Sequence, residues 1–99
     1  MLFDQVNKEL ELAERHLMVL RAVVERGPIG ILKLAEETGM PTHKVRYSLR
    51  ILEQEQLIRP SIQGAVAGDA VEEFLSSFDA SISDVVSKAA RIRELGKSQ

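Results

Sequence analysis

The sequence predicts a mainly α-helical fold with one small β-hairpin and a long helical segment towards each end. Two observations carry this prediction. Near both ends, apolar residues recur at alternating steps of three and four, which is the spacing of one helix face. Between these stretches, Gly and Pro residues divide the chain into two short helical segments and a pair of short strands.

The first helix is expected from about Phe3 to Val24, and its pattern stops at residues 25–28, where a glycine and a proline favour termination. A helix of about 22 residues extends roughly 33 Å, which exceeds what the core of one small domain needs. Two interpretations remain open. The helix can lie along its own domain, or its first half can be a dimerisation arm, with Phe3, Val6 and Leu10 facing the partner.

Two short helices are expected in the middle of the chain. Pro28–Gly30 is too short for a helix and is consistent with a brief strand. Ile31–Thr38 carries apolar residues over about two helical turns before Gly39 ends the pattern. The next helix is expected from Thr42 to Gln56, with Thr42 as its N-cap, since a threonine hydroxyl can accept a hydrogen bond from a free N–H group there.

The last third of the chain predicts a hairpin and a second long helical region. Short apolar pieces flank Gln63 and Gly64, which favour a turn between two strands. After Asp69, helical spacing resumes, either as one helix or as two helices separated near Ser76–Ser81. The apolar residues of this region are also expected to form part of the dimer interface. They are Leu75, Phe78, Ile82, Val85 and Ile92.

The chain is accordingly divided into three segments. Residues 1–26 form the N-terminal helix, which serves as dimerisation arm and first core helix. Residues 27–68 form the two short helices and the hairpin. Residues 69–99 form the C-terminal helices, which are expected to contribute to dimerisation.

Composition excludes several kinds of site. The chain has 99 residues, no cysteine and a net charge of −2, with 13 basic and 15 acidic residues. The lack of cysteine removes disulfides, thiolate catalysis and cysteine-based zinc sites. His16 is expected to be a partly exposed helix residue rather than a ligand, and no nucleophile lies beside a base. We therefore expect no enzyme activity, no metal and no cofactor. The charged N-terminus and the lack of a long apolar run predict no membrane association and a cytoplasmic location.

The helix that begins at Thr42 is predicted to have two contrasting faces at about 100° per residue. The residues expected to face inward are Val45, Ser48, Leu49 and Leu52. The residues expected to face outward in its first two turns are His43, Arg46, Tyr47 and Arg50, with Lys44 on the flank. No acidic residue lies among them. Because the helix dipole disfavours cations at this end, helix stability does not explain their placement.

A DNA groove explains this placement. The major groove admits one α-helix, and an arginine side chain can donate paired hydrogen bonds to guanine. Arg46 and Arg50 are the candidates for these base contacts. The other residues expected to contact DNA, at phosphates, sugars or base edges, are Thr42, His43, Lys44, Tyr47 and Arg59.

The stretch ILKLAEETGMPTHKVRYSLRILEQEQLIRPS combines a short helix, a glycine turn and a second helix that leads into the hairpin. With its surroundings, from about Leu17 to Leu75, it resembles a winged helix-turn-helix domain of prokaryotic transcriptional regulators. It is especially similar to small archaeal regulators that add helices at both ends. The resemblance implies binding of double-stranded DNA, with residues 42–56 as the recognition helix in the major groove and the hairpin as the wing. A homodimer is expected because one recognition helix makes too few contacts, whereas two related copies can read half-sites about 34 Å apart.

The hairpin departs from that family pattern. Winged helix proteins commonly carry Arg or Lys in the wing, whereas the tip here, residues 61–65, has no basic residue and only Arg59 lies at its base. The acidic total charge and the bare wing leave a second interpretation open, which is a winged-helix protein–protein interaction module without direct DNA binding. No residue pattern identifies a small-molecule effector.

Overall fold

The computed structural model describes residues 1–97, which form four helices and one two-stranded antiparallel sheet. The helices are α1 (Asp4–Arg26), α2 (Ile31–Thr38), α3 (Thr42–Gln54) and α4 (Val71–Lys97), and the strands are β1 (Ile58–Ser61) and β2 (Gly64–Ala67). The predicted mainly helical fold with one hairpin is confirmed. Residues 98 and 99 of the expected C-terminal segment lie outside the described residues.

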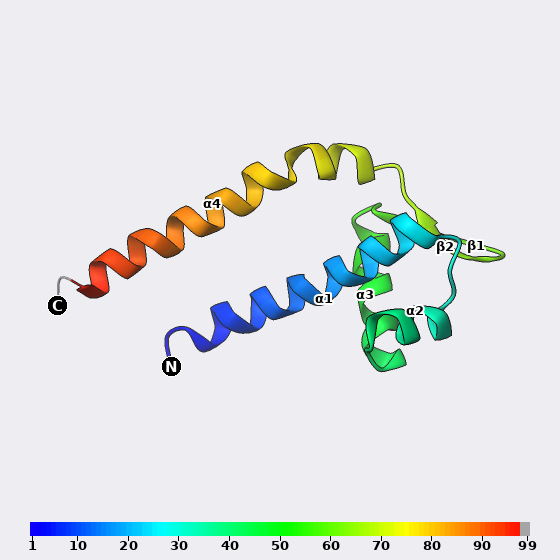
Figure 1. The fold of residues 1–99 in the computed structure, drawn as a ribbon, viewed down its shortest axis with the longest axis horizontal. Coiled ribbons are helices and arrows are strands. Elements are labelled where there is room, and N and C mark those ends of the chain that lie inside the picture. Colours follow the sequence, from blue (N-terminus) through cyan, green and yellow to red (C-terminus); the bar gives the residue numbers. More distant parts are fainter. Residues whose placement is uncertain (98–99) are drawn as a thin grey trace.

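The core lies at one end of the molecule, where α1, α2, α3 and the hairpin meet (Figure 1). Its buried apolar residues are Val19, Leu20, Val23, Ile29, Leu34, Val45, Leu52, Leu57 and Ile58. Burying one such side chain contributes about 1.5–3 kcal/mol. All of the buried residues of α1 lie in its C-terminal half, so only this half belongs to the core.

The hairpin is joined to the segment that precedes α2. Its tip is formed by Ile62 and Gln63, between strands in antiparallel register. Ile29 donates its N–H to the carbonyl oxygen of Ala65 at 3.1 Å and accepts a hydrogen bond from the N–H of Ala65 at 2.8 Å. The brief strand expected at Pro28–Gly30 is thus a single bridge, which holds the hairpin beside the helices.

The bounds of α3 differ from the prediction at both ends. Thr42 is the first helical residue and not the N-cap, which is Pro41. The carbonyl of Pro41 accepts the first hydrogen bond of the helix, from the N–H of Val45 at 3.2 Å. No side chain accepts a hydrogen bond from the free N–H groups at this end. At the other end the helix stops at Gln54, because Gln56 adopts a φ of 61° that turns the chain towards β1.

The C-terminal segment is one continuous helix of 27 residues, which excludes the alternative of two helices. Ser76 and Ser77 lie inside this helix, and their hydroxyl groups donate to the carbonyl of Glu73 at 2.8 and 3.2 Å. Serines can therefore continue the helix by bonding back to the preceding turn. No residue described in α4 is buried, and beyond Phe78 every one is exposed.

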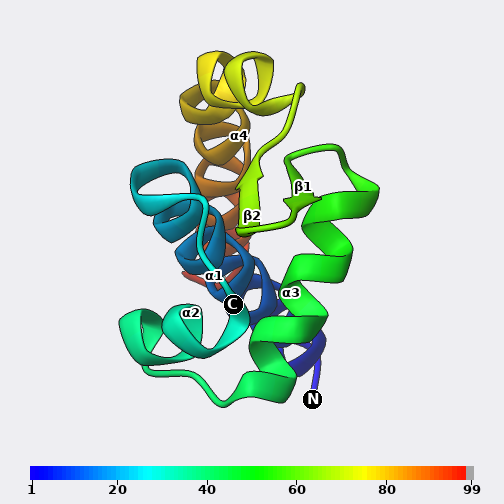
Figure 2. The ribbon, with the colours of Figure 1, turned by 90° about the vertical axis from the view of Figure 1, so that its right-hand side faces the viewer.

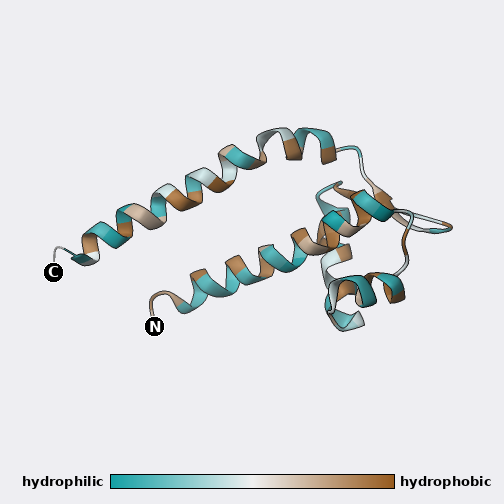
Figure 3. Ribbon diagram, in the orientation of Figure 1, coloured by the Kyte–Doolittle hydropathy of each residue, from teal (hydrophilic) through white to brown (hydrophobic). Residues whose placement is uncertain are grey.

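The two long helices make the molecule elongated. Its radius of gyration is 16.0 Å, whereas a compact domain of this length has about 13 Å. In α1, residues 4–14 are exposed except for the half-buried Leu12, so the first half of α1 does not lie on its own domain. Apolar bands nevertheless recur along both α1 and α4 (Figure 3). Among the described residues, no helix combines the length and the apolar character that crossing a membrane requires.

Replacing Gly64 by alanine should destabilise the protein strongly. Gly64 has a φ of 130°, and a Cβ atom there would lie 2.5 Å from the carbonyl carbon of Ile29. Holding a non-glycine residue in such a conformation costs about 1–3 kcal/mol, to which the clash adds. We expect the urea midpoint of Gly64→Ala to fall clearly. In the control Gly96→Ala, where a Cβ meets nothing within 4 Å, the midpoint should stay or rise slightly.

Candidate nucleic-acid interface

A short turn closed by glycine joins α2 to α3. Gly39 adopts the left-handed conformation with a φ of 72°, and its N–H donates to the carbonyl of Ala35 at 2.9 Å. The hydroxyl of Thr38 donates to the carbonyl of Leu34 at 2.7 Å. These bonds end α2 at Gly39, after which the chain changes direction. Helix α3 then runs beside α1 and towards the hairpin (Figure 2).

The inner face of α3 packs into the core. Val45, Ser48 and Leu52 are at most 3% exposed, and Leu49 is half-buried beside them. They lie against the buried residues of α1 and α2. The predicted inward face of this helix is therefore confirmed, and its orientation about its own axis is fixed by apolar burial.

The outer face of α3 carries side chains without internal partners. His43, Lys44, Arg46 and Arg50 are all exposed. Within residues 1–97, none of these four side chains makes an ion pair or a hydrogen bond. The first acidic residue of the helix is Glu53, near its C-terminal end. Positive charge is thus concentrated on the first turns of α3, although the whole chain is acidic.

Tyr47 lies at the border between this outer face and α1. Its side chain is 42% exposed, and its ring centroid lies 5.7 Å from that of His16 on α1, with the ring planes inclined by 45°. Tyr47 can therefore offer one edge to a ligand while α1 holds its other side.

His16 also reaches the inner face of α3, a contact that sequence reasoning missed. Its Nδ1 atom lies 2.7 Å from the hydroxyl oxygen of Ser48, within hydrogen-bond distance. Ser48 could have indicated this contact in the sequence, because a polar side chain on an apolar helix face needs a hydrogen-bond partner once it is buried. The pair joins α1 to α3 directly behind the cationic face.

The environment of His16 favours its neutral ring. Burial lowers the pKa of His16, and the neighbouring Arg15 lowers it further. A neutral imidazole with its proton on Nε2 accepts the hydroxyl hydrogen of Ser48 at Nδ1. This arrangement satisfies the buried hydroxyl without placing a second charge beside Arg15.

The other two predicted DNA contacts lie at opposite ends of α3. Thr42 is half-buried at its first residue, and Arg59 is exposed on β1, which follows the C-terminal end of the helix (Figure 2). At the hairpin tip, Ile62 is fully exposed, and no basic residue lies there. The predicted DNA contacts of α3 thus lie together on its first turns, whereas Arg59 lies beyond the other end of the helix.

Neither metal chemistry nor comparison with known proteins adds to this description. Within residues 1–97, no group of three or more His, Cys, Asp or Glu side chains could hold a metal ion. No family model matches the chain, and no curated protein matches it.

The stability of the protein should fall as the pH falls below about 6.5, the ordinary pKa of histidine. Folding lowers the pKa of His16, so the unfolded chain binds the proton more tightly. His16 therefore adds no pH dependence above that value, and protonation favours the unfolded chain below it. The free energy of urea unfolding should be smaller at about pH 5.5 than at about pH 7.5. His16→Gln should reduce this difference, whereas His43→Gln, on the exposed face, should preserve it.

Proposed function

We propose that the protein is a homodimeric transcriptional regulator that binds specific sequences of double-stranded DNA through α3. In this proposal, the unit from the C-terminal half of α1 to β2 is a winged helix-turn-helix domain. α2 braces α3, α3 is the recognition helix, and the hairpin is the wing. The observation that carries the proposal is the group of four side chains on the first turns of α3, which are exposed, have no acid among them and make no hydrogen bond or ion pair within residues 1–97. They are His43, Lys44, Arg46 and Arg50.

Electrostatics at the start of α3 favours an anionic partner. Cations there oppose the helix dipole, so they carry a cost that the chain itself does not offset. No side chain caps this end of the helix. Phosphate groups of DNA would neutralise the cations and accept hydrogen bonds from the free N–H groups of the first turn. Thr42, His43 and Lys44 lie closest to that position along the helix.

The two arginines supply the means of sequence recognition. Arg46 and Arg50 are four residues apart, which places their Cβ atoms about 5–6 Å from each other on one helix face. In the major groove, both guanidinium groups can therefore reach neighbouring base pairs. Each bidentate contact with guanine discriminates against a wrong base by about 1–3 kcal/mol.

A dimer follows from the small size of this surface. One recognition helix makes few contacts, and the wing adds only Arg59 at its base. Two copies related by a two-fold axis would read two half-sites about 34 Å apart, or a multiple of that distance. The exposed apolar residues of α1 and α4 supply the surface for such pairing.

One observation favours a second candidate, a protein–protein interaction module. Ile62 at the hairpin tip and Leu32 on α2 are large apolar residues at 106% and 79% exposure. A wing that carries an exposed isoleucine and no cation suits a protein surface as well as a nucleic acid. The cationic face of α3 is not explained by this alternative.

Selection of bound sequences from random duplex DNA tests the proposal. We expect enrichment of a site with two related halves in inverted orientation, each containing guanines within the contacted stretch. Failure to enrich any sequence, together with no binding of duplex DNA at low salt, would contradict the proposal and support the interaction module.

Removing both arginines should weaken specific binding strongly. Arg46→Ala with Arg50→Ala loses two contacts worth together about 2 kcal/mol or more, which corresponds to about a 30-fold weaker affinity. Fluorescence anisotropy with the selected duplex measures this loss. The control Lys8→Ala with Lys97→Ala removes the same charge from the two arms and should bind within about twofold of wild type.

The salt dependence of binding should identify phosphate contacts. For duplex DNA, the slope of log K against log salt concentration changes by about 0.9 for each phosphate contact. Lys44→Ala should therefore flatten the slope by about 0.9 and weaken all sequences equally. A loss confined to one base position, with the slope unchanged, would assign Lys44 to base recognition instead.

A further inference from the structure

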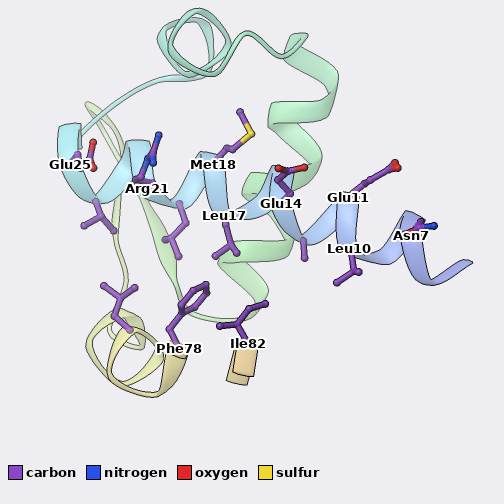
Figure 4. Close-up of a pocket in the computed structure, with 14 residues that line it drawn as sticks. Asn7, Leu10, Glu11, Glu14, Leu17, Met18, Arg21, Glu25, Phe78 and Ile82 are labelled. Carbon is purple, nitrogen blue, oxygen red and sulfur yellow. The ribbon is translucent and has the colours of Figure 1, made fainter. Parts of the chain in front are cut away.

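An apolar groove between α1 and α4 is open to solvent. Its volume is about 880 Å³. Figure 4 shows Leu10 and Leu17 of α1 pointing towards Phe78 and Ile82 of α4 across the gap. These side chains face one another without closing the space between the helices, so both walls remain available to another apolar surface.

The apolar stripe of α4 extends past this groove. Leu75, Phe78 and Ile82 line it, whereas Val85 and Ile92 continue the same spacing and are 41% and 47% exposed. A small ligand in the groove would leave the second half of the stripe in water. Steps of three and four along a helix of about 40 Å suit another helix of similar length.

The charges on α4 are divided between its two halves. Residues 71–84 carry acids and no base, and the acids are Glu72, Glu73, Asp79 and Asp84. Residues 85–97 carry one acid, Glu94, and the bases Lys88, Arg91, Arg93 and Lys97. Asp84 and Lys88 form an ion pair with each other within the helix. The helix dipole acts only within the first and last turns, so it does not explain Asp79.

We propose that α4 pairs antiparallel with α4 of a second copy of this chain, so that each α4 covers the groove of the other copy. This deepens the proposed function by assigning the surface and the direction of the dimer. Antiparallel pairing places the acidic half of each helix against the basic half of the other, whereas parallel pairing would oppose like charges. The arrangement has two-fold symmetry, as most homodimers do.

The spacing of the stripe selects one register, with the two-fold axis between Ser83 and Asp84. The facing pairs, one residue from each copy, are Leu75 with Ile92, Phe78 with Ala89, and Ile82 with Val85. Phe78, the largest residue of the stripe, thus faces a small one, so the layers keep similar volumes. Next to the seam, Glu72 lies near Arg93 of the second copy and forms a favourable charge pair.

The α1 wall of the groove is bordered by charged residues whose side chains point away from α4 (Figure 4). Its charged lining residues are Glu11, Glu14 and Glu25, with Arg21 as the only base among those that line it in residues 1–97. In the antiparallel register, the basic half of the second α4 lies over this part of α1. The apolar side chains of both walls, rather than these charged groups, face that segment.

The mass of the full chain in solution, without DNA, is the first test. Light scattering should give twice 11.0 kDa for wild type and 11.0 kDa for Ile82→Glu. Ile82 is 41% exposed in the single chain, so its replacement leaves the core intact, which circular dichroism checks. Ser87→Glu, on the outer side of α4, should stay dimeric. A monomeric wild type, or a folded Ile82→Glu that stays dimeric, overturns the proposal.

Cysteine cross-linking tests the direction, since the chain has no cysteine of its own. Leu75→Cys and Ile92→Cys should form a disulfide-linked dimer under mild oxidation when mixed, and little when each is alone. Self-linking of each variant would establish parallel pairing, and no linking in the mixture would establish another interface. Either result overturns the proposal. The same two cysteine variants should link equally well when each also carries Arg46→Ala and Arg50→Ala, so loss of DNA binding and loss of the dimer are told apart.

Discussion

The packing of α3 against the C-terminal half of α1 is the contact on which the rest of the structure depends. Val45 and Leu52 bury their side chains there, and Ser48 is satisfied by His16. An unpaired buried hydroxyl would cost about 1–3 kcal/mol, so the hydrogen bond from Ser48 to His16 contributes to the stability of the packing between α1 and α3. Once this inner face is fixed, the opposite face must point to solvent. The exposure of Arg46 and Arg50 is therefore a consequence of apolar burial on the other side of the same helix.

Acidic side chains are absent from the first two turns of α3, where four basic or histidine side chains gather. Ten of the 15 acidic residues lie on α1 and α4, the two long helices, whereas the first two turns of α3 contain none. The two long helices also carry eight of the 13 basic residues, so they have little net charge, and they extend away from the core without neutralising the basic turns of α3. Net charge is thus a poor guide to this protein, because the distribution of charge decides which ligand each surface can accept.

The sequence predicts local structure well and tertiary contacts less well. Gly and Pro residues predict both ends of α2 and, to within two residues, the C-terminal end of α1, because they act on their own neighbours in the chain. The continuity of α4 is harder to predict, since Ser76 and Ser77 favour helix ends in isolation but bond back to Glu73 inside one. The two faces of α3 follow from periodicity alone. The contact of His16 with Ser48, the position of Tyr47 beside it, and the open groove between α1 and α4 depend on how distant segments meet, which no local pattern specifies.

The length of α4 has a further consequence. A helix of 27 residues is a stiff rod of about 40 Å, and it joins the hairpin through a turn of only a few residues. If two such rods lie side by side in opposite directions, their folded ends are held apart by a distance close to the roughly 34 Å helical repeat of DNA. The spacing between the two folded ends would then be set by the length of the helix and the pairing register, and not by a flexible linker. Little orientational freedom would remain to be lost on binding, so such an assembly would tolerate little variation in the separation of its targets.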